Sequence, residues 1–236
     1  MAPKHRSSRP KTYWIGQSKV DGKVLAGLVR EGLISDVSKV RLPGKQEIPE
    51  PADDEAIVFV HYFRAGLRLP CDEMVIKVLK LFEVYLHQLT PNAIVRMGLF
   101  AWAARSEGVK ASTRAFAAAH QLHHQPQPVF ARGVQSEAHH GYLNFAYRAG
   151  LSTPAVVYKN KWPSDWTQWW FYHKVEAEEY LVSRCEEVRG NRVPDVRLKS
   201  SQQMALEAFA RCMKYLSTCD LVEEFVAAGV WPLSRG

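Results

Sequence analysis

The chain has 236 residues, of which 47% are apolar and 11% aromatic, and this hydrophobicity excludes a disordered protein. No apolar run approaches the roughly 18 to 20 residues that span a bilayer, which excludes a membrane protein. The net charge of +7 lies entirely in residues 1–45, with ten basic and three acidic side chains, because residues 46–236 hold 21 of each sign. The N terminus lacks the apolar stretch of a secretory signal. We therefore expect a neutral globular body with a basic front end, in the nucleus or the cytoplasm.

The front end divides into two parts. Residues 1–17 are basic, contain proline and serine and show no period, which predicts a flexible tail. Apolar residues at helical spacing between Ser18 and Ser35 predict an amphipathic helix, and the three prolines of 41–51 are typical of a loop. The predicted domains are thus the tail, an entry helix with a proline-rich linker over 18–51, and a globular body over 52–236.

Four helices are predicted in the first part of the body, each from a capping side chain followed by apolar residues at helical spacing. They cover 53–66, 72–86, 90–108 and 112–125. Apolar residues, Trp102 among them, surround the third helix nearly completely, which places it at the centre of the core.

Short apolar and aromatic runs broken by Gly, Pro and Asn replace this pattern over about 129–174. The runs at 141–147, 155–159 and 166–175 predict strands. Helices at 201–216 and 220–228 complete the chain, and 176–187 is either a helix or an acidic loop. The predicted fold class is mainly α with a small antiparallel β-sheet (α+β), as a compact multi-helix domain.

The signatures of phosphate-binding loops, dinucleotide sites, zinc proteases and serine hydrolases are all missing from the sequence. This favours a non-enzymatic protein without a cofactor. A histidine cluster keeps an enzyme or metal site open as an alternative. His120 and His124, four residues apart on a predicted helix, share a face and could approach one metal with His139 and His140. The competing interpretation is that histidines at a helix C terminus interact with the helix dipole.

Aromatic side chains gather near the end of the β-rich segment. Trp162, Trp166 and Trp169 are candidates for binding a partner, although packing in the core explains tryptophans in a strand equally simply. Flanking basic residues and the basic tail could contact the phosphates of nucleic acid. The candidates are Lys4, Arg6, Arg9, Lys11, Lys159 and Lys161. The alternative for the tail is a solvated, solubilising segment.

Several motifs together resemble a known family. They are FRAGLRLP at 63–70, LHQLTPNAI at 86–94, FAWA at 100–103, and KNKWPSDW with WFYHKV over 159–175. The sequence over about 20–180 resembles the plant gypsy-type transposon proteins, which look like the Gag-like part of retrotransposon polyproteins. The resemblance implies no catalytic residues, and the zinc-knuckle, aspartic-protease and reverse-transcriptase patterns are missing from this sequence.

The leading functional hypothesis is a non-enzymatic, transposon-derived module that acts through self-association or a protein partner, possibly recruited to a host role. A nucleic-acid-binding protein that uses the basic arm is the first alternative. An enzyme or metal site at the His120–His140 cluster is the second. A strict monomer without a co-purifying partner would contradict the first hypothesis, and salt-insensitive binding would contradict the first alternative.

Overall fold

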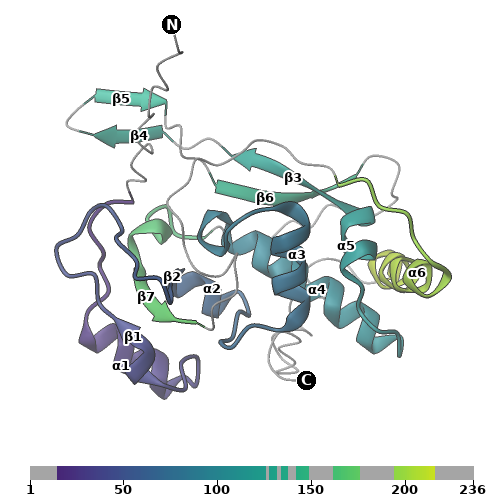
Figure 1. Cartoon of the computed structure of the whole chain (residues 1–236), viewed down its shortest axis with the longest axis horizontal. Coiled ribbons are helices and arrows are strands. Elements are labelled where there is room, and N and C mark those ends of the chain that lie inside the picture. Colours follow the sequence, from purple (N-terminus) through teal and green to yellow (C-terminus); the bar gives the residue numbers. More distant parts are fainter. Residues whose placement is uncertain are drawn as a thin grey trace, which may run out of the picture.

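The computed structural model describes residues 15–125, 128–131, 134–137, 142–148, 162–175 and 194–215 (Figure 1). Its α-helices are α1 (Gly22–Arg30), α2 (Val60–Arg64), α3 (Glu73–Phe82), α4 (Pro91–Ser106), α5 (Thr113–Ala119) and α6 (Ser200–Tyr215). Its strands are β1 (Val40–Arg41), β2 (Glu55–Phe59), β3 (His120–Gln125), β4 (Pro128–Ala131), β5 (Val134–Glu137), β6 (Tyr142–Tyr147) and β7 (Trp170–Lys174). Three short 3-10 turns are η1 (Val37–Lys39), η2 (Leu86–Gln88) and η3 (Trp166–Gln168).

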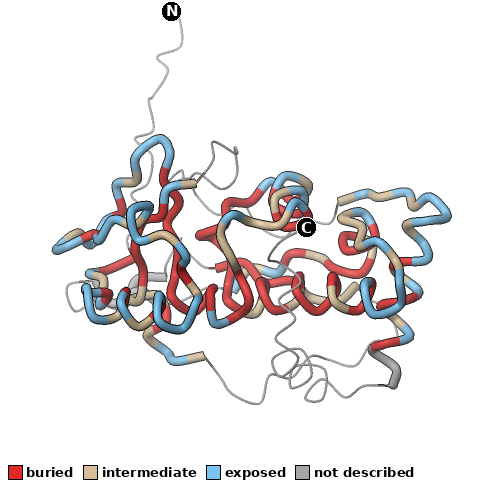
Figure 2. Tube along the Cα trace, turned by 90° about the horizontal axis from the view of Figure 1, so that it is seen from below, coloured by how far each residue is buried: buried red, intermediate tan, exposed pale blue. Residues whose placement is uncertain are grey.

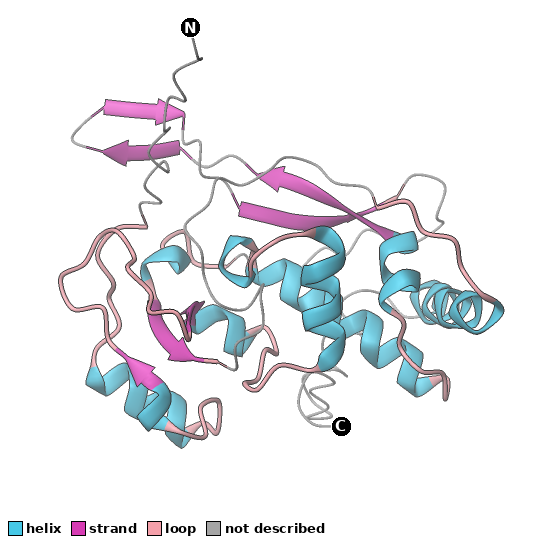
Figure 3. Cartoon of the chain, viewed as in Figure 1, coloured by secondary structure: helices cyan, strands magenta, loops and turns pink. Residues whose placement is uncertain are grey.

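These elements confirm the predicted α+β class, with helices predominating over small antiparallel sheets (Figure 3). One sheet has the order β1-β7-β2, and the pairs β3-β6 and β4-β5 form two ribbons. In Figure 1 the β3-β6 ribbon runs along one side of α3, α4 and α5, while α1 and the three-stranded sheet occupy the opposite end of the molecule from α6, with α2 between the sheet and α4.

Three helix starts in the body are confirmed, each with its capping side chain. Asp72 accepts a hydrogen bond from the Met74 N–H at 2.8 Å, before α3. Thr90 and Ser112 do the same before α4 and α5, at 3.2 and 3.3 Å to the N–H three residues on. These side chains satisfy donors that the first helical turn leaves unpaired, so local sequence alone located the starts.

The predicted helix over 53–66 is wrong in its first half. Residues Glu55–Phe59 form β2, which pairs antiparallel with β7 so that Ile57 faces Tyr172, and the helix that follows is only α2. Every residue of β2 is buried. A strand covered on both faces has no apolar-polar alternation, so its sequence cannot be told from a buried helix by periodicity.

The fourth predicted helix is shorter than expected. It ends at Ala119 instead of near Gln125, because His120–Gln125 form β3 and pair with β6 residue by residue, from His120 opposite Tyr147 to Gln125 opposite Tyr142. Pairing with β6 supplies the backbone hydrogen bonds that a longer helix would have made.

Of the strands and helices predicted after residue 140, some fall on residues that the structure describes and others do not. The strand over 141–147 is confirmed as β6, and the helix over 201–216 as α6. The strand over 166–175 is confirmed only from Trp170, since η3 precedes it. The strand at 155–159, the segment 176–187 and the helix at 220–228 lie outside the residues that the structure describes.

Buried residues form one continuous core along the long axis of the molecule (Figure 2). The central position of α4 is confirmed, because eleven of its residues are buried, although Trp102 is only partly buried. At one end of this core the Phe116 ring stacks on His120 at 4.2 Å and meets Phe145 and Phe100 edge-on at 4.9 and 5.5 Å. Such aromatic pairs add to the stabilisation that burial provides.

The N-terminal segment packs more extensively than its composition indicated. Ile15 is buried and its N–H donates to the Glu47 carbonyl, and the Gly16 carbonyl accepts a hydrogen bond from the buried Trp170 indole. Ile15 and Gly16, which we assigned to the tail, therefore pack against the body, and β1 makes the linker part of the β1-β7-β2 sheet.

Candidate partner-binding pocket

The three candidate tryptophans occupy different environments. Trp166 is 6% exposed and packs edge-on against Phe59 at 5.0 Å, so core packing accounts for it. Trp162 and Trp169 are only partly buried and lie over the core surface. The Trp162 indole N–H donates to Asn92 at 2.7 Å, which fixes that ring at the start of α4.

Trp169 lines a small pocket of about 290 Å³, which we call the tryptophan pocket. Its walls come from three segments that are far apart in sequence: α1, α2 and the loop over 163–169. Val24, Leu28 and Val60 supply apolar surface from the two helices. The volume is at the lower end of the range for ligand pockets, and it suits one large side chain of a partner better than a cofactor.

Three charged residues, Glu31, Arg64 and Asp165, line the pocket, and Lys19 pairs with one of them. Lys19 forms an ion pair with Asp165 at 2.7 Å, and the same carboxylate accepts a hydrogen bond from the Trp169 indole at 3.2 Å. The Lys19 ammonium also lies 6.0 Å from the centre of the Trp169 ring. The hydrogen bond from Lys19 is the main reason that the pKa of Asp165 is lowered. This network holds Trp169 in place at the wall of the pocket.

His61 is the buried polar residue of the pocket. Its side chain meets Trp162 edge-on at 5.8 Å, and its Nδ1 atom has no hydrogen-bond partner among the described residues. Burial, with a smaller contribution from the positive charge of Arg64, lowers the pKa of His61 to about 4. The imidazole is therefore neutral at pH 7, and its buried Nδ1 atom has no partner in the described residues.

Sequence reasoning missed His61 and the contribution of α1 to this pocket. His61 falls in the region that was predicted as one long helix, where it looked like a core residue. The sequence shows Asp165 next to Trp166, but only the fold brings His61 and Arg64 to the same pocket.

The histidine cluster does not have the predicted spacing. His120 and His124 lie on strand β3, and four residues on a strand span about 13 Å instead of sharing one helix turn. His120 is buried in the aromatic core, where its Nδ1–H donates to the Phe116 carbonyl at 3.0 Å and burial lowers its pKa to about 3. Within the described ranges no group of three or more His, Cys, Asp or Glu side chains could hold a metal. His139 and His140 are not among the described residues.

The nucleic-acid candidates all lie outside the described part of the chain. They are Lys4, Arg6, Arg9, Lys11, Lys159 and Lys161. Cys71, at the start of α3, has a thiol pKa raised to about 12, chiefly by burial, so it is not a thiolate nucleophile at pH 7.

The structure is a mostly helical α+β domain with a small, mainly apolar pocket. Residues 57–123 match the family model described as "Putative gypsy type transposon", which identifies this segment as a gypsy-type transposon-derived domain. The match begins in β2 and ends in β3, so it contains the first three motifs of the sequence resemblance and excludes those of 159–175. No curated protein and no solved structure matches the chain. No helix in the described ranges is long and apolar enough to cross a membrane.

Proposed function

We propose that the protein is a non-enzymatic, Gag-like domain that acts by associating with a second copy of itself. In this association the tryptophan pocket of each copy receives an exposed apolar side chain of the other. The observation that carries the proposal is the position of the exposed apolar residues. Of the five large apolar side chains that are exposed in the described ranges, four lie between residues 29 and 48, within α1 or in the segment that follows it: Val29, Val37, Leu42 and Ile48.

A surface that carries both a pocket and neighbouring apolar side chains can pair with its own copy. In a two-fold dimer the same patch of each subunit forms the interface, so each copy would give a side chain and receive one. Val29 lies on α1, the helix that supplies Gly27 and Leu28 to the pocket wall. A side chain that enters a desolvated pocket is the typical dominant contact of a protein interface.

The pocket can be filled without disturbing the fold. Gly27 lines the pocket on α1, and a Cβ at this position would meet no atom within 4 Å. Gly22, at the start of the same helix, is equally open but does not line the pocket. Gly27→Leu therefore blocks the pocket, and Gly22→Leu is the matched control.

Sedimentation velocity of the full chain over a wide concentration range tests the proposal. We expect a concentration-dependent dimer in the parent protein and in Gly22→Leu. Gly27→Leu should weaken the dimer by at least about tenfold, which corresponds to about 1.4 kcal/mol. Val37→Ser should weaken it to a smaller degree. A parent protein that stays monomeric, or a dimer that tolerates Gly27→Leu, would contradict the proposal.

A further inference from the structure

A second concave surface lies on another part of the molecule, where the residues that follow α1 meet the turn before α3. It is an open groove of about 1340 Å³, which we call the basic groove. Its walls are formed by the segment 32–35, the turn over 68–72 with the start of α3, the end of α4 with the segment 108–114, and the start of α6. This volume exceeds the usual 300–1000 Å³ of a small-molecule pocket and suits a segment of a polymer.

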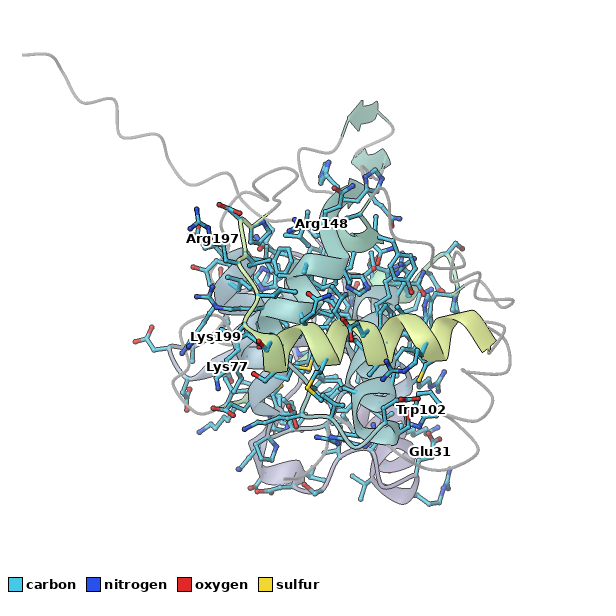
Figure 4. All side chains as sticks on the ribbon, turned by 90° about the vertical axis from the view of Figure 1, so that its right-hand side faces the viewer. Glu31, Lys77, Trp102, Arg148, Arg197 and Lys199 are labelled. Atoms are coloured by element: carbon cyan, nitrogen blue, oxygen red, sulfur yellow. The ribbon has the colours of Figure 1, made fainter. Side chains whose placement is uncertain are left out.

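The groove is positively charged. Five basic and two acidic side chains line it. Both acids already have partners, since Arg105 approaches Asp72 at 3.3 Å and Lys77 pairs with Glu73 at 2.6 Å. Lys110 and Arg114 are exposed and make no ion pair or hydrogen bond with any described residue. Figure 4 shows Lys77 on the side of the molecule where α6 begins.

The groove also offers apolar surface between these charges. Leu33, Leu69 and Val109 are partly buried residues that line it. Met204 on α6 is 55% exposed, the highest value of any large apolar side chain in the described ranges. Methionine adapts its shape to different ligands and is frequent on surfaces that bind peptides.

The lining favours a polypeptide over a nucleic acid. No aromatic ring belongs to the described lining, so unpaired bases would find no stacking surface there. Carboxylate side chains can instead pair with Lys110 and Arg114 while neighbouring aliphatic side chains contact Met204 and Leu69.

We propose that the basic groove binds a segment of a partner protein in which acidic residues alternate with aliphatic ones. This site goes beyond the self-association proposed above, because it uses other residues at another part of the surface. The occupant is recognised by two features together, its negative charge and its apolar side chains. A segment with only one of them should bind more weakly.

Fluorescence anisotropy of the full chain with labelled peptides of equal length tests this assignment. The probes are a Glu/Leu peptide, a Glu/Ser peptide, a Lys/Leu peptide and a single-stranded oligouridine. We expect the Glu/Leu peptide to bind most tightly. The double variant Lys110→Glu/Arg114→Glu should weaken its binding by at least about tenfold, because two attractions become repulsions. Lys23→Glu/Lys45→Glu, a pair of exposed residues outside the groove, is the matched control.

The same titrations with Gly27→Leu separate this proposal from self-association. Blocking the tryptophan pocket should leave the affinity for the Glu/Leu peptide unchanged within about twofold. The groove assignment is overturned if the Glu/Leu peptide fails to bind, if the double variant binds it as well as the control does, or if the oligouridine or the Lys/Leu peptide binds more tightly.

Discussion

The tryptophan pocket and the basic groove both border the segment of α1, yet they have opposite character. Gly27 and Leu28 of the helix line the pocket, and Gly32 and Leu33 just beyond its end line the groove. The pocket is small and mainly apolar, with one neutral histidine, whereas the groove is more than four times larger and carries excess positive charge.

The difference follows from how each surface is built. The groove is made mainly from the ends of helices and their connections, where capping residues and charged side chains gather. The pocket is made from the sides of α1 and α2 and a loop that arrives from residues 163–169. Charge is therefore expected to govern binding at the groove, and shape and apolar contact at the pocket.

The largest expected change in the free energy of unfolding comes from truncating a buried aromatic side chain in α5, the helix whose start lines the groove. Phe116→Ala removes a buried ring from the first turns of α5, whose start lines the groove, and should lower the free energy of unfolding by about 3 to 5 kcal/mol. Urea denaturation measures this. Trp102→Ala is the comparison: its ring is only partly buried, so its loss should be smaller, about 1 to 2 kcal/mol. Equal losses would show that the core does not centre on Phe116.

Acid should destabilise the fold through buried histidines. Burial lowers the pKa of His87 and of His120 to about 3, below the 6.5 of an exposed histidine. Between pH 6.5 and about 3 these histidines are protonated in the unfolded chain but neutral in the folded chain. The free energy of unfolding is therefore highest above pH 6.5 and falls as the pH drops. For His120 alone the loss between pH 6.5 and 4 is about 3 kcal/mol.

His120→Phe isolates this effect on the groove side. The variant keeps a ring against Phe116 but removes the titrating group, so its unfolding free energy should fall less steeply between pH 6.5 and 4 than that of the parent. Denaturation curves at several pH values measure the slopes. An unchanged slope would mean that other groups account for the acid sensitivity.

The entry segment is anchored beside β7 by a nearly buried carboxylate. Glu55 accepts hydrogen bonds from Arg41 Nε at 2.8 Å and from the Ala52 N–H at 2.8 Å, and Arg41 lies over the Tyr172 ring at 3.7 Å. Hydrogen bonding from Arg41 lowers the pKa of Glu55. Glu55→Gln should cost about 2 kcal/mol in unfolding free energy, because it removes a charge-assisted pair.

Because β1 and β2 both pair with β7, hydrogen exchange of Glu55→Gln should show which elements are destabilised. Faster exchange is expected around β1 and the linker, on the pocket side, with little change in α5. Faster exchange throughout the chain would mean that the two sides of the molecule do not respond separately.

The smallest expected effect is an increase in stability. Gly27→Ala replaces a glycine in a helix where the new methyl group meets open space, so thermal unfolding should report a stabilisation of about 0.5 to 1 kcal/mol. The methyl group also narrows the pocket slightly, so self-association should weaken less than in Gly27→Leu. A destabilised Gly27→Ala would show that the pocket wall is more crowded than the structure indicates.

Much of the helical part of the fold could be predicted from local sequence. Asp72, Thr90 and Ser112 mark helix starts because a capping side chain acts within three residues, independently of the rest of the chain. The boundaries of β2 and β3 could not be predicted, because each depends on a partner strand many residues away.

For the candidate site, too, part could be predicted from local sequence and part required the fold. Sequence alone determined that tryptophans gather over 162–170 and that the chain over about 20–180 resembles the gypsy-type transposon proteins, of which residues 57–123 match the family model. Only the tertiary structure decided that Trp166 is buried, that Trp169 forms a pocket with His61 and α1, and that basic residues from four segments share one groove. The physical reason is that caps and composition act locally, whereas burial and pockets arise when segments distant in sequence pack together.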